Sequence, residues 1–138
     1  MATDFFARSD TLEECYEFML AYAGQGLPSE QGSAAGSQVR DFLERATRAL
    51  SGLAASCRLA ISEQQLEPAA QYQAFVSILD RDAEDSLAAI ELVLAQPAIS
   101  SQLIDNLNAS MHLRALLTDL FLIGEILNAR MGSVSPTT

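Results

Sequence analysis

The sequence predicts an all-α fold, an antiparallel four-helix bundle with one short and three long helices. Two observations support this prediction. Hydrophobic residues recur at intervals of three and four in four segments, which is the period of an amphipathic helix, and no segment alternates between polar and apolar residues as a half-buried strand does. The chain has 138 residues, of which 49% are hydrophobic, so it is long enough for a core that is stable without disulfides or a structural metal. We expect a single domain over residues 11–131.

The first helix is predicted to be the short one. Residues 1–10 are expected to be a lead-in, because Thr11 followed by Glu14 matches a capping box and places the start of the helix near residue 10 or 11. Gly24 or Gly26 then ends it, since glycine is the preferred residue just beyond a helix C-terminus.

Residues 24–36, GQGLPSEQGSAAG, are predicted to form a flexible linker between the first two helices. A connection of this length either crosses the end of the bundle or is a mobile segment, and both alternatives remain open. Ser37 is a suitable N-cap for the second helix, in which apolar residues follow a three-four spacing as far as Ala60. Gly52 is a position where this helix can bend.

The third helix is expected from Pro68, which suits a first helical turn, to about Gln96. An acidic cluster occupies its middle. A helical run of acids lacks the looped geometry and central glycine of a calcium site, so a solvated face is the favoured interpretation. The members of the cluster are Asp80, Asp82, Glu84 and Asp85.

The fourth helix is predicted to start at Ser100, its N-cap, and to end near Met131. Pro97 stops the preceding helix, so the turn is tight and the two long helices should form an antiparallel hairpin. Residues 132–138 are expected to be a disordered tail.

The fourth helix contains the most apolar stretch of the chain, residues 111–127. Arg114, Asp119 and Glu125 interrupt it before it reaches the roughly 20 apolar residues of a membrane span, so we expect it to be buried in protein. One broad apolar arc suffices for the core, and a second, narrower arc remains. This second arc packs either on the first helix or against another subunit, and we favour a homodimer. Its predicted interface residues are Ile104, Met111, Ala115, Leu122 and Ile126.

The charge is strongly acidic, with 18 acidic residues against 8 basic ones and a net charge of −10. An acidic surface repels phosphate backbones and anionic lipids, so we expect no nucleic-acid or membrane partner, whereas a basic protein segment would be attracted. Cys15 and Cys57 form no CxxC motif and are expected to be buried thiols in a reducing compartment. Because the N-terminus does not resemble an export signal, a cytoplasmic location is expected.

One polar strip of the fourth helix is the candidate ligand-binding site, because acids and the only histidine recur along it at intervals of about seven. A histidine flanked by carboxylates can act as a general base, a metal ligand or a phosphoacceptor. A single histidine excludes the paired ExxH motifs of di-iron bundles. A buried carboxylate at the end of the strip would need a partner, either an arginine of the second helix or the histidine of a symmetry mate. The strip comprises Asp105, Asn108, His112 and Asp119.

An acidic bundle of this size resembles histidine phosphotransfer domains, which would make His112 a phosphoacceptor. The chain departs from that family where Leu113, Arg114, Ala115 and Leu116 replace a small segment containing lysine, and it has no lysine at all. The function that the sequence favours is therefore a non-enzymatic interaction protein, an adaptor or assembly factor without cofactor or metal, that binds a helical or basic segment of a partner. A catalytic, ligand-binding or metal-binding bundle with a pocket beside His112 and Asp119 is the alternative.

Overall fold

The computed structural model describes residues 2–132, which are all-helical and contain no strand. Residue 1 and residues 133–138 lie outside this part of the chain, and with them almost all of the predicted tail. The six helices are α1 (Ala2–Ala23), α2 (Gly36–Ser51), α3 (Leu53–Glu63), α4 (Ala69–Leu94), α5 (Ser101–Ala109) and α6 (Met111–Gly132).

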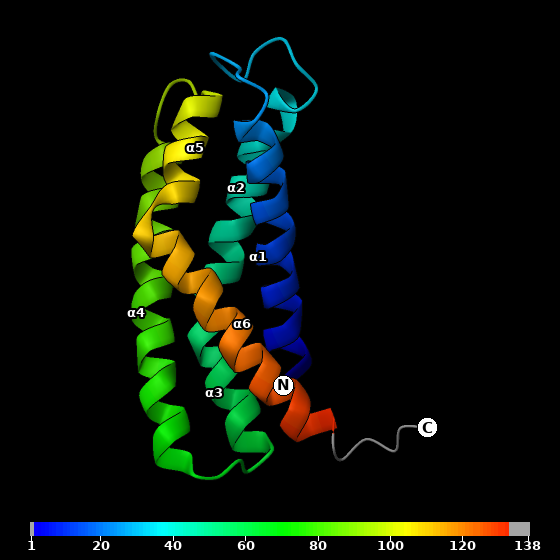
Figure 1. Ribbon diagram of the computed structural model, residues 1–138, viewed down its shortest axis with the longest axis vertical. Helices are drawn as coiled ribbons and strands as arrows, with labels where there is room; N and C mark the ends of the chain where they lie inside the picture. The colour runs from blue at the N-terminus through cyan, green and yellow to red at the C-terminus, as the bar shows by residue number, and fades with distance from the viewer. Residues whose placement is uncertain (1, 133–138) are drawn as a thin grey trace.

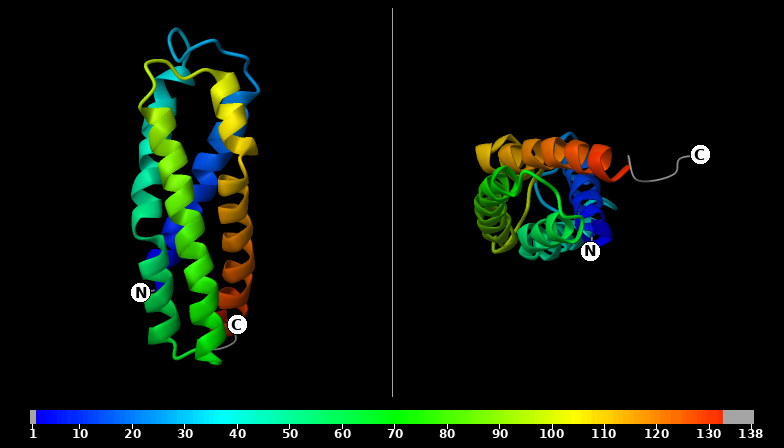
Figure 2. Two further views of the ribbon diagram at one scale, coloured as in Figure 1. Left: turned by 90° about the vertical axis from the view of Figure 1, so that its left-hand side faces the viewer. Right: turned by 90° about the horizontal axis from the view of Figure 1, so that it is seen from below.

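The helices lie along one long axis around a common centre (Figures 1 and 2). The connection between α1 and α2 and the turn between α4 and α5 lie at one end, and the turn between α3 and α4 lies at the other (Figure 1). α4 packs against α2, α3 and α6, while α1 packs against α2, α3 and α5. The core draws fully buried side chains from every helix, among them Phe5, Met19, Tyr22, Leu43, Leu53, Leu79, Ile90, Ile104, Leu116, Leu120 and Leu127.

The predicted lead-in over residues 1–10 is wrong, because α1 already begins at Ala2. Phe5 is fully buried and precedes Leu12 and Met19 at intervals of seven, so the hydrophobic face of the helix continues toward the N-terminus. The Thr11 and Glu14 pair therefore lies inside a helix, and the length of the apolar face sets the start of α1.

The connection between α1 and α2 crosses the end of the molecule and is bonded to the start of α5. The Leu27 amide donates to Ser101 Oγ at 2.8 Å, and the Ser101 amide donates to the Leu27 carbonyl at 2.8 Å. Ser101 Oγ also donates to the Tyr22 carbonyl at 2.6 Å, and the Tyr22 hydroxyl donates to the Ile99 carbonyl at 2.7 Å. These bonds decide between the two alternatives left open for this segment.

Glu30 gives the same connection a second attachment. Its carboxylate accepts from the Ile99 amide at 2.6 Å and pairs with Arg40 of α2. The Arg40 guanidinium also donates to the carbonyls of Leu94 and Gln96, at 2.9 and 2.8 Å, and so satisfies groups at the C-terminal end of α4. These bonds lower the pKa of Glu30 although burial opposes the shift.

The predicted second helix is divided at Gly52 into α2 and α3. The Arg8 guanidinium donates to the carbonyls of Arg48 and Ala49, at 2.9 and 3.2 Å, at the C-terminal end of α2. A β-carbon at residue 52 would lie 2.8 Å from that guanidinium, so glycine makes room for it. Arg8 of α1 thus stabilises the break between α2 and α3 by satisfying carbonyl groups at the end of α2.

The predicted continuous fourth helix is also wrong, because it divides at Ser110 into α5 and α6. Ser110 has an extended backbone, with φ −65° and ψ 145°, and its Oγ accepts from the Leu113 amide at 3.3 Å. It caps α6 much as Ser100, the predicted N-cap, caps α5 by accepting from the Leu103 amide. Residues 101–109 and 111–132 therefore do not share one helical face.

Candidate functional site

A groove between α4 and α6 has an apolar section near the start of α4. The two helices pack against each other, and α6 runs obliquely to α4, starting beside it and slanting away toward the C-terminus (Figure 1). A depression of about 270 Å³ opens between them, and Gln71 is the single amide side chain in its lining. Leu122 and Ile126 contribute from α6 and are 51% and 37% exposed. The remaining lining residues are Pro68, Tyr72, Phe75 and Ile123.

Two acids lie beyond this depression on the helices that form it, and neither lines it. Asp82 of α4 lies four residues beyond the exposed Ile78, and Asp119 of α6 lies three and four residues before Leu122 and Ile123. Residues at these spacings are neighbours on a helix surface. The two acids therefore lie on the same pair of helices as the apolar depression.

Asp119 is the most unusual charged group in the groove. Its side chain is only 8% exposed, and its Oδ2 atom has no hydrogen-bond partner within the described chain. Burial, and after it a hydrogen bond to Asp82 and the charge of Asp82, raise the pKa of Asp119 from its ordinary 3.8 to about 7. The structure thus gives Asp119 a second acid as its neighbour in place of the expected arginine or histidine.

His112 lies farther along the same groove and is largely exposed. Its Nδ1 atom is 3.9 Å from Asp85 Oδ2, and its backbone carbonyl accepts from Ser86 Oγ at 3.0 Å. His112 and Asp119 therefore face different acids of α4, Asp85 and Asp82, which lie about one turn apart. The structure does not unite the two residues around one reaction centre.

The other two residues of the predicted strip, Asp105 and Asn108, belong to α5 and do not lie in line with His112 and Asp119. Asp105 is exposed and lines a depression with Ala23 and Leu27 near the end of α1. Asn108 is buried and donates through Nδ2 to the Met19 carbonyl at 3.1 Å, which ties α5 to α1. The helix break at Ser110 is the reason that the strip does not persist.

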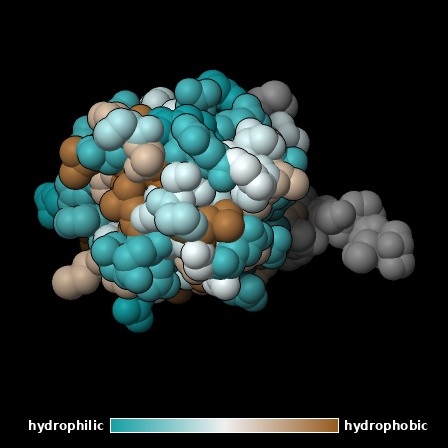
Figure 3. All heavy atoms as spheres, turned by 90° about the horizontal axis from the view of Figure 1, so that it is seen from above, coloured by the Kyte–Doolittle hydropathy of each residue, from teal (hydrophilic) through white to brown (hydrophobic). Residues whose placement is uncertain are grey.

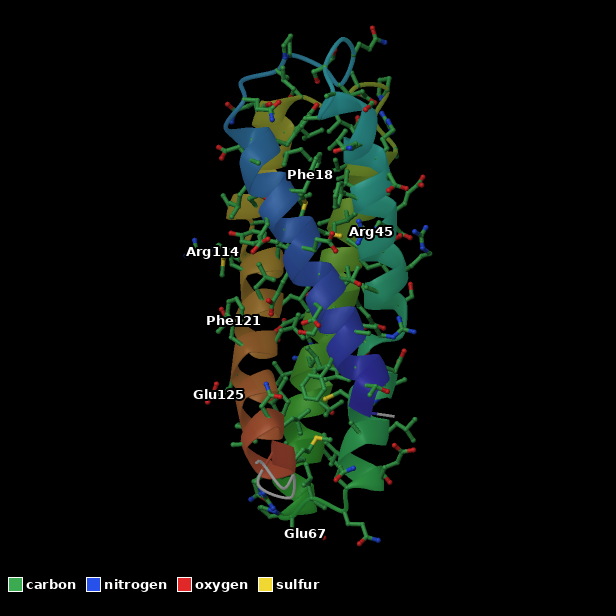
Figure 4. All side chains as sticks on the ribbon, turned by 90° about the vertical axis from the view of Figure 1, so that its right-hand side faces the viewer. Phe18, Arg45, Glu67, Arg114, Phe121 and Glu125 are labelled. Atoms are coloured by element: carbon green, nitrogen blue, oxygen red, sulfur yellow. The ribbon has the colours of Figure 1, made fainter. Side chains whose placement is uncertain are left out.

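The predicted interface arc divides in the same way. Ile104 is completely buried in α5, so it is not part of the surface, whereas Met111 is 81% exposed, Ala115 is partly buried, and Leu122 and Ile126 line the apolar depression. The sequence prediction omitted Phe121, which is 61% exposed and points away from the neighbouring helices, as do Arg114 and Glu125 (Figure 4).

Asp82 was also missed as a site residue, since it was assigned to a solvated acidic face. Its spacing of three from Asp85 was the available signal, because that spacing places both carboxylates on one side of α4. Pairing of this side with α6 is a tertiary feature that α4 alone does not encode.

The potential metal ligands of residues 2–132 are dispersed, and the two thiols are buried. No group of three or more histidine, cysteine, aspartate or glutamate side chains in this range is arranged to hold a metal ion. Burial raises the pKa of Cys15 to about 11 and of Cys57 to about 12, so both thiols stay protonated and are poor nucleophiles near neutrality. Among the described helices, none is both long and apolar enough to cross a membrane.

A second apolar surface lies at the end of the molecule shown in Figure 3, where hydrophobic patches appear between polar side chains. It includes a depression of about 440 Å³ beside the turn between α4 and α5, lined by Leu92, Val93, Gln96, Pro97, Ala98 and Leu103. Like the depression between α4 and α6, it has no carboxylate in its lining.

Comparisons of the chain with protein-family models, with curated proteins and with solved structures find no match.

Proposed function

We propose that this chain is a non-enzymatic interaction module, an antiparallel four-helix bundle that binds an amphipathic helix of a partner protein in the groove between α4 and α6. In this proposal the bundle has four long helices. Two of them are α1 and α4, and the other two are each divided by a break, into α2 and α3 and into α5 and α6. The partner helix lies along the groove and inserts apolar side chains between the two helices.

The observation that carries the proposal is the apolar depression beside the acid pair. Leu122 and Ile126 remain exposed although polar residues at their positions would leave the core intact. A depression of about 270 Å³ accommodates one or two aliphatic side chains, which is how a docked helix anchors itself in a groove.

The charge of the groove indicates the chemistry of the partner. Asp82 and Asp85 are solvent-accessible acids of α4 in a chain with a net charge of −10, so a helix with basic residues is attracted and an acidic one is repelled. A second copy of this chain, the homodimer expected from the sequence, is the competing proposal for the same surface, and it would bring a second acidic groove into contact.

Selection of displayed helical peptides on the purified protein tests the proposal. Selected sequences should share two apolar residues at a spacing of three or four and a nearby arginine or lysine. Leu122→Asp should abolish their binding, because it places a charge in the apolar depression, and circular dichroism checks that the variant remains folded.

Phe121→Asp is the matched control, since it introduces the same charge on the adjacent, outward-pointing residue of α6 (Figure 4). Peptides that bind both variants equally well would contradict the proposed groove. Self-association of the unmodified protein that Leu122→Asp alone disrupts would assign the surface to a second copy of the chain.

A further inference from the structure

We propose that a depression between α1 and α2 binds an isolated phosphate monoester group. The depression has a volume of about 370 Å³, and its lining contains Arg8, Arg45 and Arg48 but no carboxylate. Three of the 8 basic residues therefore meet at one place in a chain with a net charge of −10. The depression shares no lining residue with the one between α4 and α6, so the inference does not depend on the proposed function.

Two of the three guanidinium groups are held in place by the fold. Arg8 comes from α1, and its Nη1 atom donates to the Arg48 and Ala49 carbonyls of α2, at 2.9 and 3.2 Å. Arg45 lies where α2 faces α1 (Figure 4), and its guanidinium is 4.9 Å from the centre of the Phe42 ring, a cation–π contact. A ligand therefore meets donors that are already ordered, which lowers the entropy cost of binding.

The depression has N–H donors to spare. Arg48 is exposed, and its side chain makes no hydrogen bond or ion pair within residues 2–132. Of the Arg45 nitrogens, only Nη2 has an acceptor in that range, and Thr11 brings a hydroxyl to the same lining. A carboxylate has two oxygens to accept these donors, whereas a phosphate monoester has three terminal oxygens and a charge of about −1.5 to −2 at neutral pH. The phosphate group is therefore the better match.

Two acids of α1 already pair with arginines of the depression and compete with a ligand. Asp4 Oδ2 lies 3.0 Å from Arg8 Nε, and Glu14 Oε1 lies 2.8 Å from Arg45 Nη2. These carboxylates are 51% and 58% exposed, so the ion pairs are weak in water and a group of higher negative charge can replace them. The acidic surface beyond the depression repels a polymer of phosphates, which favours a single phosphate group over a nucleic acid or an anionic membrane.

Glycerol 3-phosphate is the probe, with glycerate as its carboxylate counterpart and glycerol as its uncharged one. Isothermal titration in about 0.15 M salt, without phosphate or sulfate, should show saturable binding of glycerol 3-phosphate, about tenfold weaker binding of glycerate and none of glycerol. A phosphoserine peptide with uncharged flanking residues is titrated in parallel. Tighter binding of this peptide would assign the phosphate to a modified protein side chain, and tighter binding of glycerol 3-phosphate would assign it to a small molecule.

Arg48→Gln should weaken the binding of glycerol 3-phosphate about tenfold. The fold should tolerate this change, because the Arg48 side chain has no bonded partner within the described chain. Arg114→Gln is the matched control, since it removes the same charge from an exposed side chain of α6 that points away from the neighbouring helices (Figure 4), and it should leave the affinity nearly unchanged.

Glu14→Gln should have the opposite effect and tighten binding about threefold, because it removes the acid that competes for Arg45. Glu13→Gln removes the same charge from the adjacent exposed residue, which makes no ion pair within residues 2–132, and should change the affinity less.

Three results would overturn the inference. They are the absence of binding of both phosphate probes, binding of glycerate as tight as that of glycerol 3-phosphate, and an equal loss of affinity in Arg48→Gln and Arg114→Gln. The last result would mean that the net charge of the molecule, and not the depression, attracts the anion.

Discussion

The carboxyl group of Asp119 is buried near the acid Asp82, and within residues 2–132 no cation offsets its charge, so it opposes folding whenever it is ionised. Its pKa in the folded state, about 7, exceeds its ordinary value of 3.8. Between these two pH values the folded chain holds a proton that the unfolded chain has released. Stability therefore falls as the pH rises through this window and is lowest above pH 7.

Replacement of Asp119 by asparagine should for this reason stabilise the protein at pH 8 by roughly 1–3 kcal/mol and flatten the dependence between pH 5 and pH 8. Urea denaturation at both pH values measures the change. Asp105→Asn is the control, because Asp105 is an exposed aspartate of α5 and its replacement removes the same charge from the whole molecule. A loss of stability at pH 8 on replacing Asp119 would show that a stabilising partner holds this carboxylate.

At the scale of the elements, two glycines in helices have opposite roles. Gly124 lies in the interior of α6, and an added β-carbon would meet nothing within 4 Å, whereas Gly36 at the start of α2 packs directly on the backbone carbonyl of Glu30. Gly124 lowers the helix propensity of α6, and no close contact requires a glycine there. Gly36 allows the connection before α2 to approach the helix closely.

Gly124→Ala should raise the free energy of unfolding by about 0.5–1 kcal/mol, the difference in helix propensity. Gly36→Ala should lower it by about 1–3 kcal/mol, because the carbonyl of Glu30 has to move. Thermal denaturation of the two variants side by side measures both effects. A stabilising Gly36→Ala would mean that the connection does not pack on α2 as described.

Helices were easier to predict than their interruptions. The three-four spacing identified the long apolar segments, and Ser100 was correctly assigned as an N-cap, because both signals are local. The break at Ser110 was missed, since the apolar pattern continues across it and only the capping serine marks it. The early start of α1 was missed because the Thr11 and Glu14 pair was interpreted as a capping box, whereas the burial of Phe5 is visible only in the structure.

The candidate site was only partly predictable for the same reason. Exposed apolar residues of α6 such as Leu122 followed from a surplus hydrophobic arc, and Asp119 stood out as an acid in an apolar run. Its neighbour Asp82 comes from α4, and which side of α4 meets α6 depends on the packing of the whole chain. The pattern of residues within a single helix does not contain that information.

At the scale of the whole molecule, the account assigns one side of a strongly acidic helical protein to binding a partner helix. The depression between α4 and α6 has acids on both of its helices, whereas the depression beside Leu92 and Leu103 lies at the end of the molecule next to the turn between α4 and α5. A helix that carries both leucine and arginine should therefore prefer the groove to the end.

Backbone amide chemical-shift mapping with a selected helical peptide tests this central claim most directly, because it reports the location of binding without any substitution. The account predicts that the perturbed amides lie along residues 68–86 of the segment containing α4 and residues 112–126 of α6. Perturbations gathered instead around residues 92–103, along α1 and α2, or nowhere at saturating peptide would contradict it.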